Sequence, residues 1–114
     1  MDTLQLDNAL NARILAGRNL DAFSEFYDEH VVAQENDEAE RPGRAAWIAG
    51  FTEMSKNIES YTSRLIANAA SGDVSFSEWE NEMTFTGGAP MKIAQVAVRQ
   101  WKDGRVVRER FYHK

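Results

Sequence analysis

The last predicted strand of this chain carries a carboxylate and an imidazole, Glu109 and His113. Side chains alternate along a strand, so both lie on one face, and we expect direct or water-bridged contact between them. An imidazole held by a carboxylate is a usable acid/base pair near neutral pH. The competing interpretation pairs Glu109 with Arg99 across a hairpin and leaves His113 at a frayed chain end.

A second group of carboxylates, Glu78, Glu80 and Glu82, resembles a metal site in composition. Carboxylates at alternate strand positions spread over about 14 Å, which is too far for one ion without further ligands. We therefore expect no metal site there, and cross-strand ion pairs instead. The expected partners are Arg64, Arg108 and Arg110. The chain also lacks a glycine-rich phosphate loop, so no cofactor is predicted.

A hairpin must position Glu109 and His113. Residues 96–101 and 106–112 are rich in β-branched and aromatic side chains, and the Asp103-Gly104 pair between them predicts a tight turn. Strict alternation then gives the second strand two different faces. One face would hold Val107, Glu109, Phe111 and His113, and the other Val106, Arg108, Arg110 and Tyr112. If helices cover the first face, its residues line any remaining cavity, while the arginine face is solvated or contacts a subunit.

Helical periodicity characterises the first half of the chain. A single apolar stripe predicts a helix over residues 3–16 that ends at Gly17, and Asn19 is expected to cap a second helix. A third helix should begin after Pro42 and Gly43. Its apolar positions, at i, i+4, i+7 and i+11, are Trp47, Phe51, Met54 and Ile58.

From residue 59 onward the apolar period changes from 3.6 to 2, which predicts strands over residues 59–70, 74–86 and 91–101. Residues 30–35 are predicted to form a further short strand. Helices followed by antiparallel strands indicate the α+β class, with the helices on one face of a bent sheet. The aromatic and methionine side chains would be core residues, and some would also wall a pocket.

The composition is typical of a single globular domain and argues against several classes of partner. The 114 residues suit a single domain spanning 1–114, with 43% hydrophobic and 27% charged residues. The absence of cysteine, of a signal-like start and of a long apolar run predicts a cytoplasmic protein without a membrane partner. The net charge of -5, without a basic patch, argues against nucleic acid as a partner.

Three stretches of the chain resemble the SnoaL-like group of the NTF2-like superfamily. They are Leu20 to Val32, Gly43 to Ile48 and Trp101 to Tyr112, and the order of elements agrees over essentially the whole chain. The resemblance implies an NTF2-like cone, in which three N-terminal helices pack on a curved antiparallel sheet and enclose an apolar pocket at the wide end. It also implies a homodimer through the exposed sheet face. Because members of this fold differ in function, the pocket residues must decide the activity.

Residue-by-residue comparison with ketosteroid isomerases places their catalytic aspartate at Glu35. A glutamate in a dry pocket could take a proton next to a carbonyl; the alternative is a charged residue leaning into solvent. The isomerase oxyanion groups fall near Leu10 and Ala97, which cannot supply side-chain hydrogen bonds, so that mechanism is not expected.

Two other activities of the superfamily match in part. In epoxide hydrolases, Arg99 would match the catalytic arginine, but the last-strand aspartate falls on Phe111. In polyketide cyclases, the acidic residue and nearby histidines are loosely matched by Glu109 and His113.

The resemblance implies a protein that binds a small apolar molecule, and the residues leave two interpretations open. One is an acid/base isomerase, cyclase or hydrolase with Glu35 or Glu109 as base and His113 as partner. The other is a non-catalytic ligand-binding or dimerisation module. The residues expected to line the ligand site are Tyr27, Trp47, Phe51, Met54, Trp79, Arg99 and Phe111.

Overall fold

The computed structural model describes residues 1–114 and contains three helices and six strands. The elements in chain order are α1 (Thr3–Leu15), α2 (Asn19–Phe26), β1 (Tyr27–Glu35), β2 (Arg41–Pro42), α3 (Arg44–Ser55), β3 (Ile58–Ser71), β4 (Val74–Phe85), β5 (Met91–Lys102) and β6 (Arg105–His113). None of the helices has the length and apolar character needed to cross a membrane.

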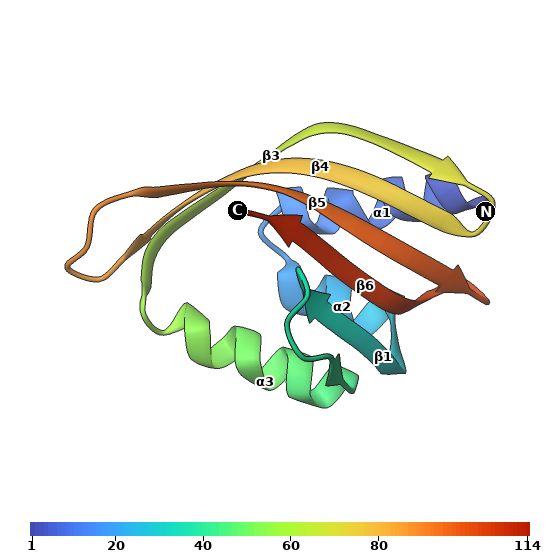
Figure 1. Ribbon diagram of the computed structural model, residues 1–114, viewed down its shortest axis with the longest axis horizontal. Helices are drawn as coiled ribbons and strands as arrows, with labels where there is room; N and C mark the ends of the chain where they lie inside the picture. Colours follow the sequence, from blue (N-terminus) through green and yellow to red (C-terminus); the bar gives the residue numbers. More distant parts are fainter.

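The strands form one curved sheet in the order β2-β1-β6-β5-β4-β3 (Figure 1). The four long strands from β3 to β6 are antiparallel to their neighbours, as predicted. The sheet as a whole is mixed, because β1 runs parallel to β6. Parallel neighbours need a long connection, and here everything from β2 to β5 lies between the two strands.

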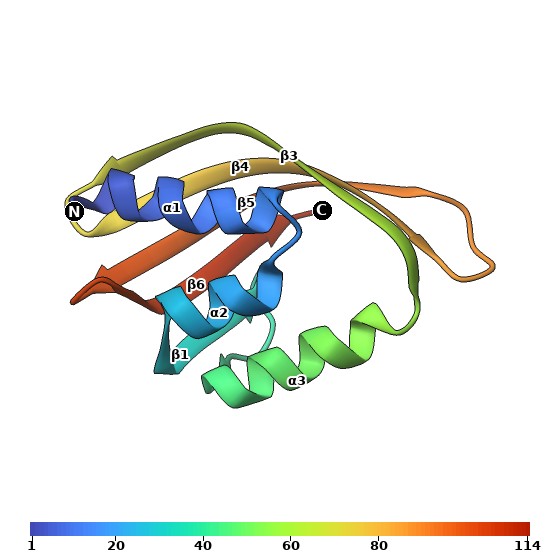
Figure 2. The ribbon, with the colours of Figure 1, turned by 180° about the vertical axis from the view of Figure 1, so that it is seen from behind.

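All three helices lie on the concave side of the sheet (Figure 2). The helix α1 packs along β3 and β4, whereas α3 packs on β1, β2 and α2. A capping box fixes the start of α1, since the Asp2 carboxylate accepts from the Gln5 backbone N–H and the Gln5 side chain accepts from that of Asp2. The prediction that Asn19 caps α2 is wrong. Arg18 occupies the N-cap position and makes no side-chain hydrogen bond there.

The terminal hairpin turns where the sequence predicts, but its alternation is broken once. Asp103 and Gly104 both have positive φ, 53° and 78°, as a two-residue hairpin turn of the primed kind requires. A register shift after Gln100 then places Val106 opposite Trp101 and turns it inward, where it is fully buried. The predicted outward position of Val106 is therefore wrong, because an irregularity of the ladder shifts the alternation by one residue.

The core is concentrated at one end of the cone, which we call the narrow end. Side chains from α1, α2, β1 and the terminal hairpin close it completely; among them are Leu10, Phe23, Val31 and Trp101. At the opposite wide end, α3 contains no buried residue. The two ends therefore offer different environments to the side chains that they position.

Candidate functional site

A buried ionic network occupies the narrow end. The guanidinium of Arg99 lies between two carboxylates, with Nη1 at 2.7 Å from Asp7 Oδ1 and Nε at 2.6 Å from Glu109 Oε2. The three side chains are at most 1% exposed. Helix α1 supplies one carboxylate, and adjacent strands β5 and β6 supply the rest, since Arg99 and Glu109 are cross-strand partners.

Hydrogen bonds satisfy the network on its α1 side. Ser75 and Ser77 donate their hydroxyls to Asp7 at 2.7 and 2.6 Å, and Asn11 Oδ1 accepts from Arg99 at 2.7 Å. Burial by itself raises the pKa of the Asp7 carboxyl, but the Arg99 guanidinium and the hydrogen bonds outweigh it, so this pKa lies below its ordinary value. Asp7 therefore stays ionised within the core.

Both carboxylate oxygens of Glu109 are engaged within the protein. The Tyr27 hydroxyl donates to Oε1 through a short hydrogen bond, while Arg99 donates to Oε2. Burial, followed by the charge of Glu109, raises the pKa of the Tyr27 hydroxyl well above its ordinary value. Glu109 is thus paired with Arg99 across the hairpin, which is the competing interpretation of the sequence, and it is held out of solvent.

The predicted contact between Glu109 and His113 does not form. Four residues along a strand span about 13 Å, with Phe111 between them on the same face. His113 instead contacts Glu35, with 2.5 Å between Nε2 and Glu35 Oε2. The two side chains are 22% and 27% exposed, so this pair, unlike Glu109, has access to solvent.

The Glu35–His113 pair is held by the loop after β1. Asn36 adopts positive φ and makes three hydrogen bonds with β6. Its N–H donates to the Phe111 carbonyl, its Oδ1 accepts from the His113 N–H, and its carbonyl accepts from the Arg110 side chain. The Lys114 backbone carbonyl and then the Glu35 carboxylate raise the pKa of the His113 imidazole. His113 is therefore fixed at the chain end and does not fray.

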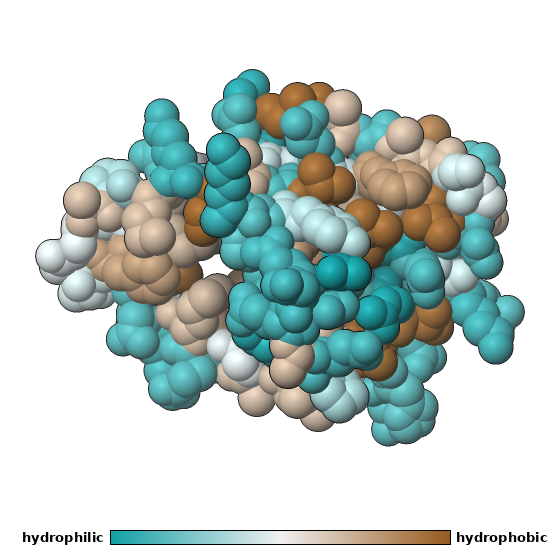
Figure 3. Space-filling view, in the orientation of Figure 1, coloured by the Kyte–Doolittle hydropathy of each residue, from teal (hydrophilic) through white to brown (hydrophobic).

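At the wide end, α3 packs on α2, β1 and β2, so the outer parts of β3, β4 and β5 have no helix packed against them. We call the concave face of these strand parts, together with the end of α3, the mouth. Its strand side chains are Tyr61, Ser63, Asn81, Met83, Met91 and Ile93, and α3 contributes Phe51 and Met54. Large apolar members remain substantially exposed, with Met54 at 41%, Tyr61 at 41% and Met91 at 47%. Figure 3 shows the surface hollowed on this side.

Trp47 forms the wall between the mouth and the narrow end. Its ring stacks on Phe111, with centroids 5.8 Å apart and planes 10° from parallel. It also meets the edge of Phe23 and lies 6.4 Å from the ring of Tyr27. The aromatic wall therefore separates the Tyr27–Glu109 pair from the open region.

The structure divides the residues that the sequence selected between these regions. Tyr27, Arg99 and Glu109 belong to the sealed network, and Glu35 and His113 form the half-buried pair. The remaining five line the wall or the concave face near the mouth: Trp47, Phe51, Met54, Trp79 and Phe111.

Sequence reasoning missed the α1 side of the network. Asp7 and Asn11 stand four residues apart beside the apolar stripe of α1, and Ser75 and Ser77 alternate on β4; all four are buried. A polar i, i+4 pair next to an apolar stripe was the available signal, but it is also typical of a solvated helix edge.

On the convex face, the predicted ion pairs between the β4 glutamates and three arginines form only in part. Arg64 pairs with Glu80 at 2.6 Å, as expected for neighbouring strands. Arg108 pairs with Glu40 instead of a β4 glutamate, and Arg110 donates to the Asn36 carbonyl. The reason is the strand order, in which β5 separates β6 from β4.

The geometry defines a cone-shaped α+β protein with an ionic network at its closed end and a half-buried carboxylate–imidazole pair near its mouth. The family model described as the SnoaL-like domain matches residues 8–109. The chain therefore belongs to the SnoaL-like family. Curated proteins give no significant match.

Solved structures with the same fold have diverged far in sequence. A candidate SnoaL-like polyketide cyclase from Mesorhizobium loti superposes with a TM-score of 0.85 at 17% identity, over 98% of this chain and 99% of that one. An NTF2-like protein of unknown function from Burkholderia pseudomallei gives 0.86 at 16% identity, over 100% and 92%. An LEH-like epoxide hydrolase from M. tuberculosis gives 0.82 at 16% identity, over 98% and 84%. At these identities the similarity establishes the fold.

Proposed function

We propose that this protein binds a small, largely apolar molecule in the mouth and that Glu35 and His113 act on it by acid/base chemistry. The observation that carries the proposal is the 2.5 Å contact between Glu35 and His113, both half-buried and bordering the apolar concave face at Phe111. Catalytic acid/base groups need access to the substrate as well as a partner that sets their protonation. Glu35 meets the first requirement and Glu109 does not.

The pair can work in either protonation state of the imidazole. When His113 is protonated, it holds the Glu35 carboxylate and can give a proton to a ligand oxygen. When it is neutral, either Glu35 or the imidazole can take a proton from a carbon next to a carbonyl. The fold thus supports proton transfer to or from an enolisable apolar molecule without a cofactor.

Proton exchange on 2-tetralone in D2O tests this proposal, because the probe is apolar and carries acidic C–H groups beside a ketone. NMR should show faster deuterium incorporation with the protein than in buffer. Glu35→Gln should lower the protein-dependent rate by about 10²-fold or more, the usual contribution of a general base. The matched control Asp37→Asn changes an exposed neighbouring carboxylate and should keep the rate.

Two outcomes contradict acid/base catalysis by this pair. Exchange at the wild-type rate in Glu35→Gln would remove Glu35 from the mechanism. Binding of 2-tetralone without any acceleration would support the non-catalytic ligand-binding module instead.

A hydrolase that uses the Arg99 network is a second candidate. It is favoured by the carboxylate–guanidinium–carboxylate arrangement, because such a set can orient and activate a water molecule, and a structural neighbour carries the name of an epoxide hydrolase. It requires Trp47 to move aside. Hydrolysis of a small epoxide that is abolished by Glu109→Gln and kept in Glu35→Gln would favour this candidate over the first.

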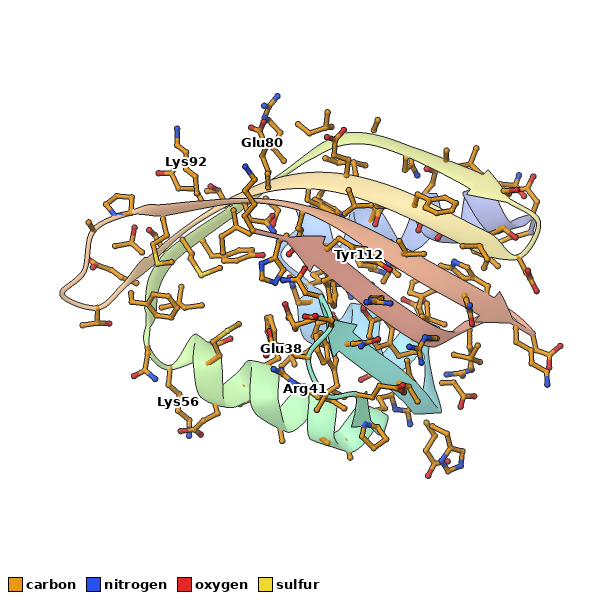
Figure 4. All side chains as sticks on the ribbon, in the orientation of Figure 1. Glu38, Arg41, Lys56, Glu80, Lys92 and Tyr112 are labelled. Carbon is orange, nitrogen blue, oxygen red and sulfur yellow. The ribbon has the colours of Figure 1, made fainter.

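We also propose that two copies associate through the convex sheet face. Phe76 and Tyr112 are 41% and 45% exposed there. The glutamates of β4 and the arginines of β6 flank β5, so a two-fold axis over β5 would set each acidic row against the partner's basic row. Glu80 and Lys92 point away from the helices on this side (Figure 4).

Light scattering should give a dimer for the wild type and a monomer for Val98→Glu; a monomeric wild type would contradict the proposal.

A further inference from the structure

The mouth contains one buried polar side chain whose hydrogen bonding is incomplete. Asn81, on β4, is 6% exposed, and its Oδ1 is buried without a hydrogen-bond partner. Its neighbours on the same face are mostly apolar, namely Trp79 and Met83 along the strand and Ile93 across from it on β5. An unpaired amide oxygen in such surroundings is unfavourable for folding alone.

The aromatic wall between the mouth and the narrow end has a complementary feature. Trp47 on α3 has a buried indole N–H without an acceptor. No other side-chain nitrogen or oxygen buried in the chain lacks a partner. By contrast, the equally polar narrow end pairs Asp7, Asn11 and Arg99. Unpaired groups are therefore confined to the region where a ligand is proposed to bind.

We propose that Asn81 is the polar anchor of the mouth and selects an apolar molecule that carries a hydroxyl group over the corresponding hydrocarbon. This inference rests on the proposed function, because it assigns the ligand class of the same site. The hydroxyl donates to Asn81 Oδ1, and the apolar body occupies the space toward α3. Trp47 offers its N–H to a ligand oxygen at the boundary with the narrow end.

The surroundings of Asn81 can adapt to such a ligand. Met54, Met83 and Met91 carry unbranched side chains that can repack around a guest. His113 ends β6 two strands away from β4, and its Cα lies about 12 Å from that of Asn81 by strand spacing and rise. A two-ring molecule anchored at Asn81 is therefore long enough to approach the Glu35–His113 pair.

Titration of the ¹⁵N-labelled protein with 2-naphthol and with naphthalene at pH 7 tests the inference, because the probes differ only in one hydroxyl. The side-chain amide peaks of Asn81 should shift with 2-naphthol, which should bind about 3- to 10-fold more tightly, as one hydrogen bond allows. In Asn81→Leu the two affinities should become equal within about twofold. The matched control Thr84→Val removes a hydroxyl from the opposite face of β4 and should keep the preference.

Thermal unfolding of the same variants separates a ligand-binding role from a structural one. Asn81→Leu should fold and unfold at a higher temperature than the wild type, because leucine fills a similar volume without an unpaired oxygen. A lower unfolding temperature would indicate a structural role and overturn the inference.

Binding outcomes distinguish this inference from the proposed function. Equal binding of both probes by the wild type, or a preference retained in Asn81→Leu, overturns the role of Asn81 and leaves an apolar ligand site intact. Binding of neither probe overturns the ligand site, and the anchor with it.

Discussion

The two ends of the cone use polar residues in opposite ways. At the narrow end, Asp7, Arg99 and Glu109 are enclosed and satisfied by one another and by neighbouring hydroxyl and amide groups. At the wide end, Glu35 and His113 meet at the solvent boundary, and Asn81 lacks a partner for its oxygen. A satisfied polar network specifies the fold, whereas an incomplete one is available to a ligand. Burial alone would favour Glu109 as the functional carboxylate, whereas our proposal assigns that role to Glu35 because solvent reaches it.

The largest effect is expected from Arg99→Ala. The change leaves two buried carboxylates without their cation, which should cost about 3–5 kcal/mol in the free energy of unfolding. This loss is comparable to the whole stability of many small domains. Urea denaturation followed by circular dichroism measures it. The matched control Arg64→Ala removes an exposed ion pair with Glu80 and should cost less than about 1 kcal/mol. Similar costs for both variants would mean that the network does not stabilise the narrow end.

Apolar truncation should show the same contrast at smaller magnitude. Leu10→Ala creates a cavity at a fully buried position of the narrow end and should cost about 2–5 kcal/mol. Met54→Ala changes a side chain that is 41% exposed in the mouth and should cost less than about 1 kcal/mol. The urea midpoints of the two variants test this comparison. A cost at Met54 equal to that at Leu10 would show that the mouth is closed and packed in solution.

Acid should weaken the narrow end through Asp7. The folded pKa of Asp7 is lowered below its usual 3.8, so its charge stabilises the fold above that value, and the contribution is lost as the pH falls through the lowered pKa. The stability difference between wild type and Asp7→Asn should therefore be constant above about pH 5 and shrink below about pH 4. Chemical denaturation across this range provides the test. A difference that does not change with pH would mean that folding does not shift the pKa of Asp7.

The smallest effect is expected at the wide end. The pKa of His113 is raised above 6.5, so protonated His113 contributes stability below about pH 6.5, and the contribution is lost as the pH rises through the raised value. NMR titration of the imidazole should show a lower pKa in Glu35→Gln than in the wild type. Asp37→Asn should leave it nearly unchanged. An unaltered pKa in Glu35→Gln would show that the pair does not form in solution.

Much of the architecture could be predicted because local patterns determine it. The Asp103-Gly104 turn, the apolar stripe of α1 and the period-2 strands follow from backbone preferences of nearby residues. The inward position of Glu109 followed from the same alternation. The buried position of Val106 did not follow from alternation, because a ladder irregularity depends on how two strands pair and has no signature in either strand alone.

The site was predictable only as a set of residue types. The sequence alone placed Glu109 and His113 on one strand face of an α+β fold, and the family resemblance supplied the cone shape and the candidates Glu35 and Arg99. Tertiary structure decided their partners, because α1 brings Asp7 to Arg99 across 92 residues and β1 brings Glu35 to His113 across 78. Electrostatic pairing acts over a few ångströms in space, and chain folding sets those distances, so sequence separation carries no information about them.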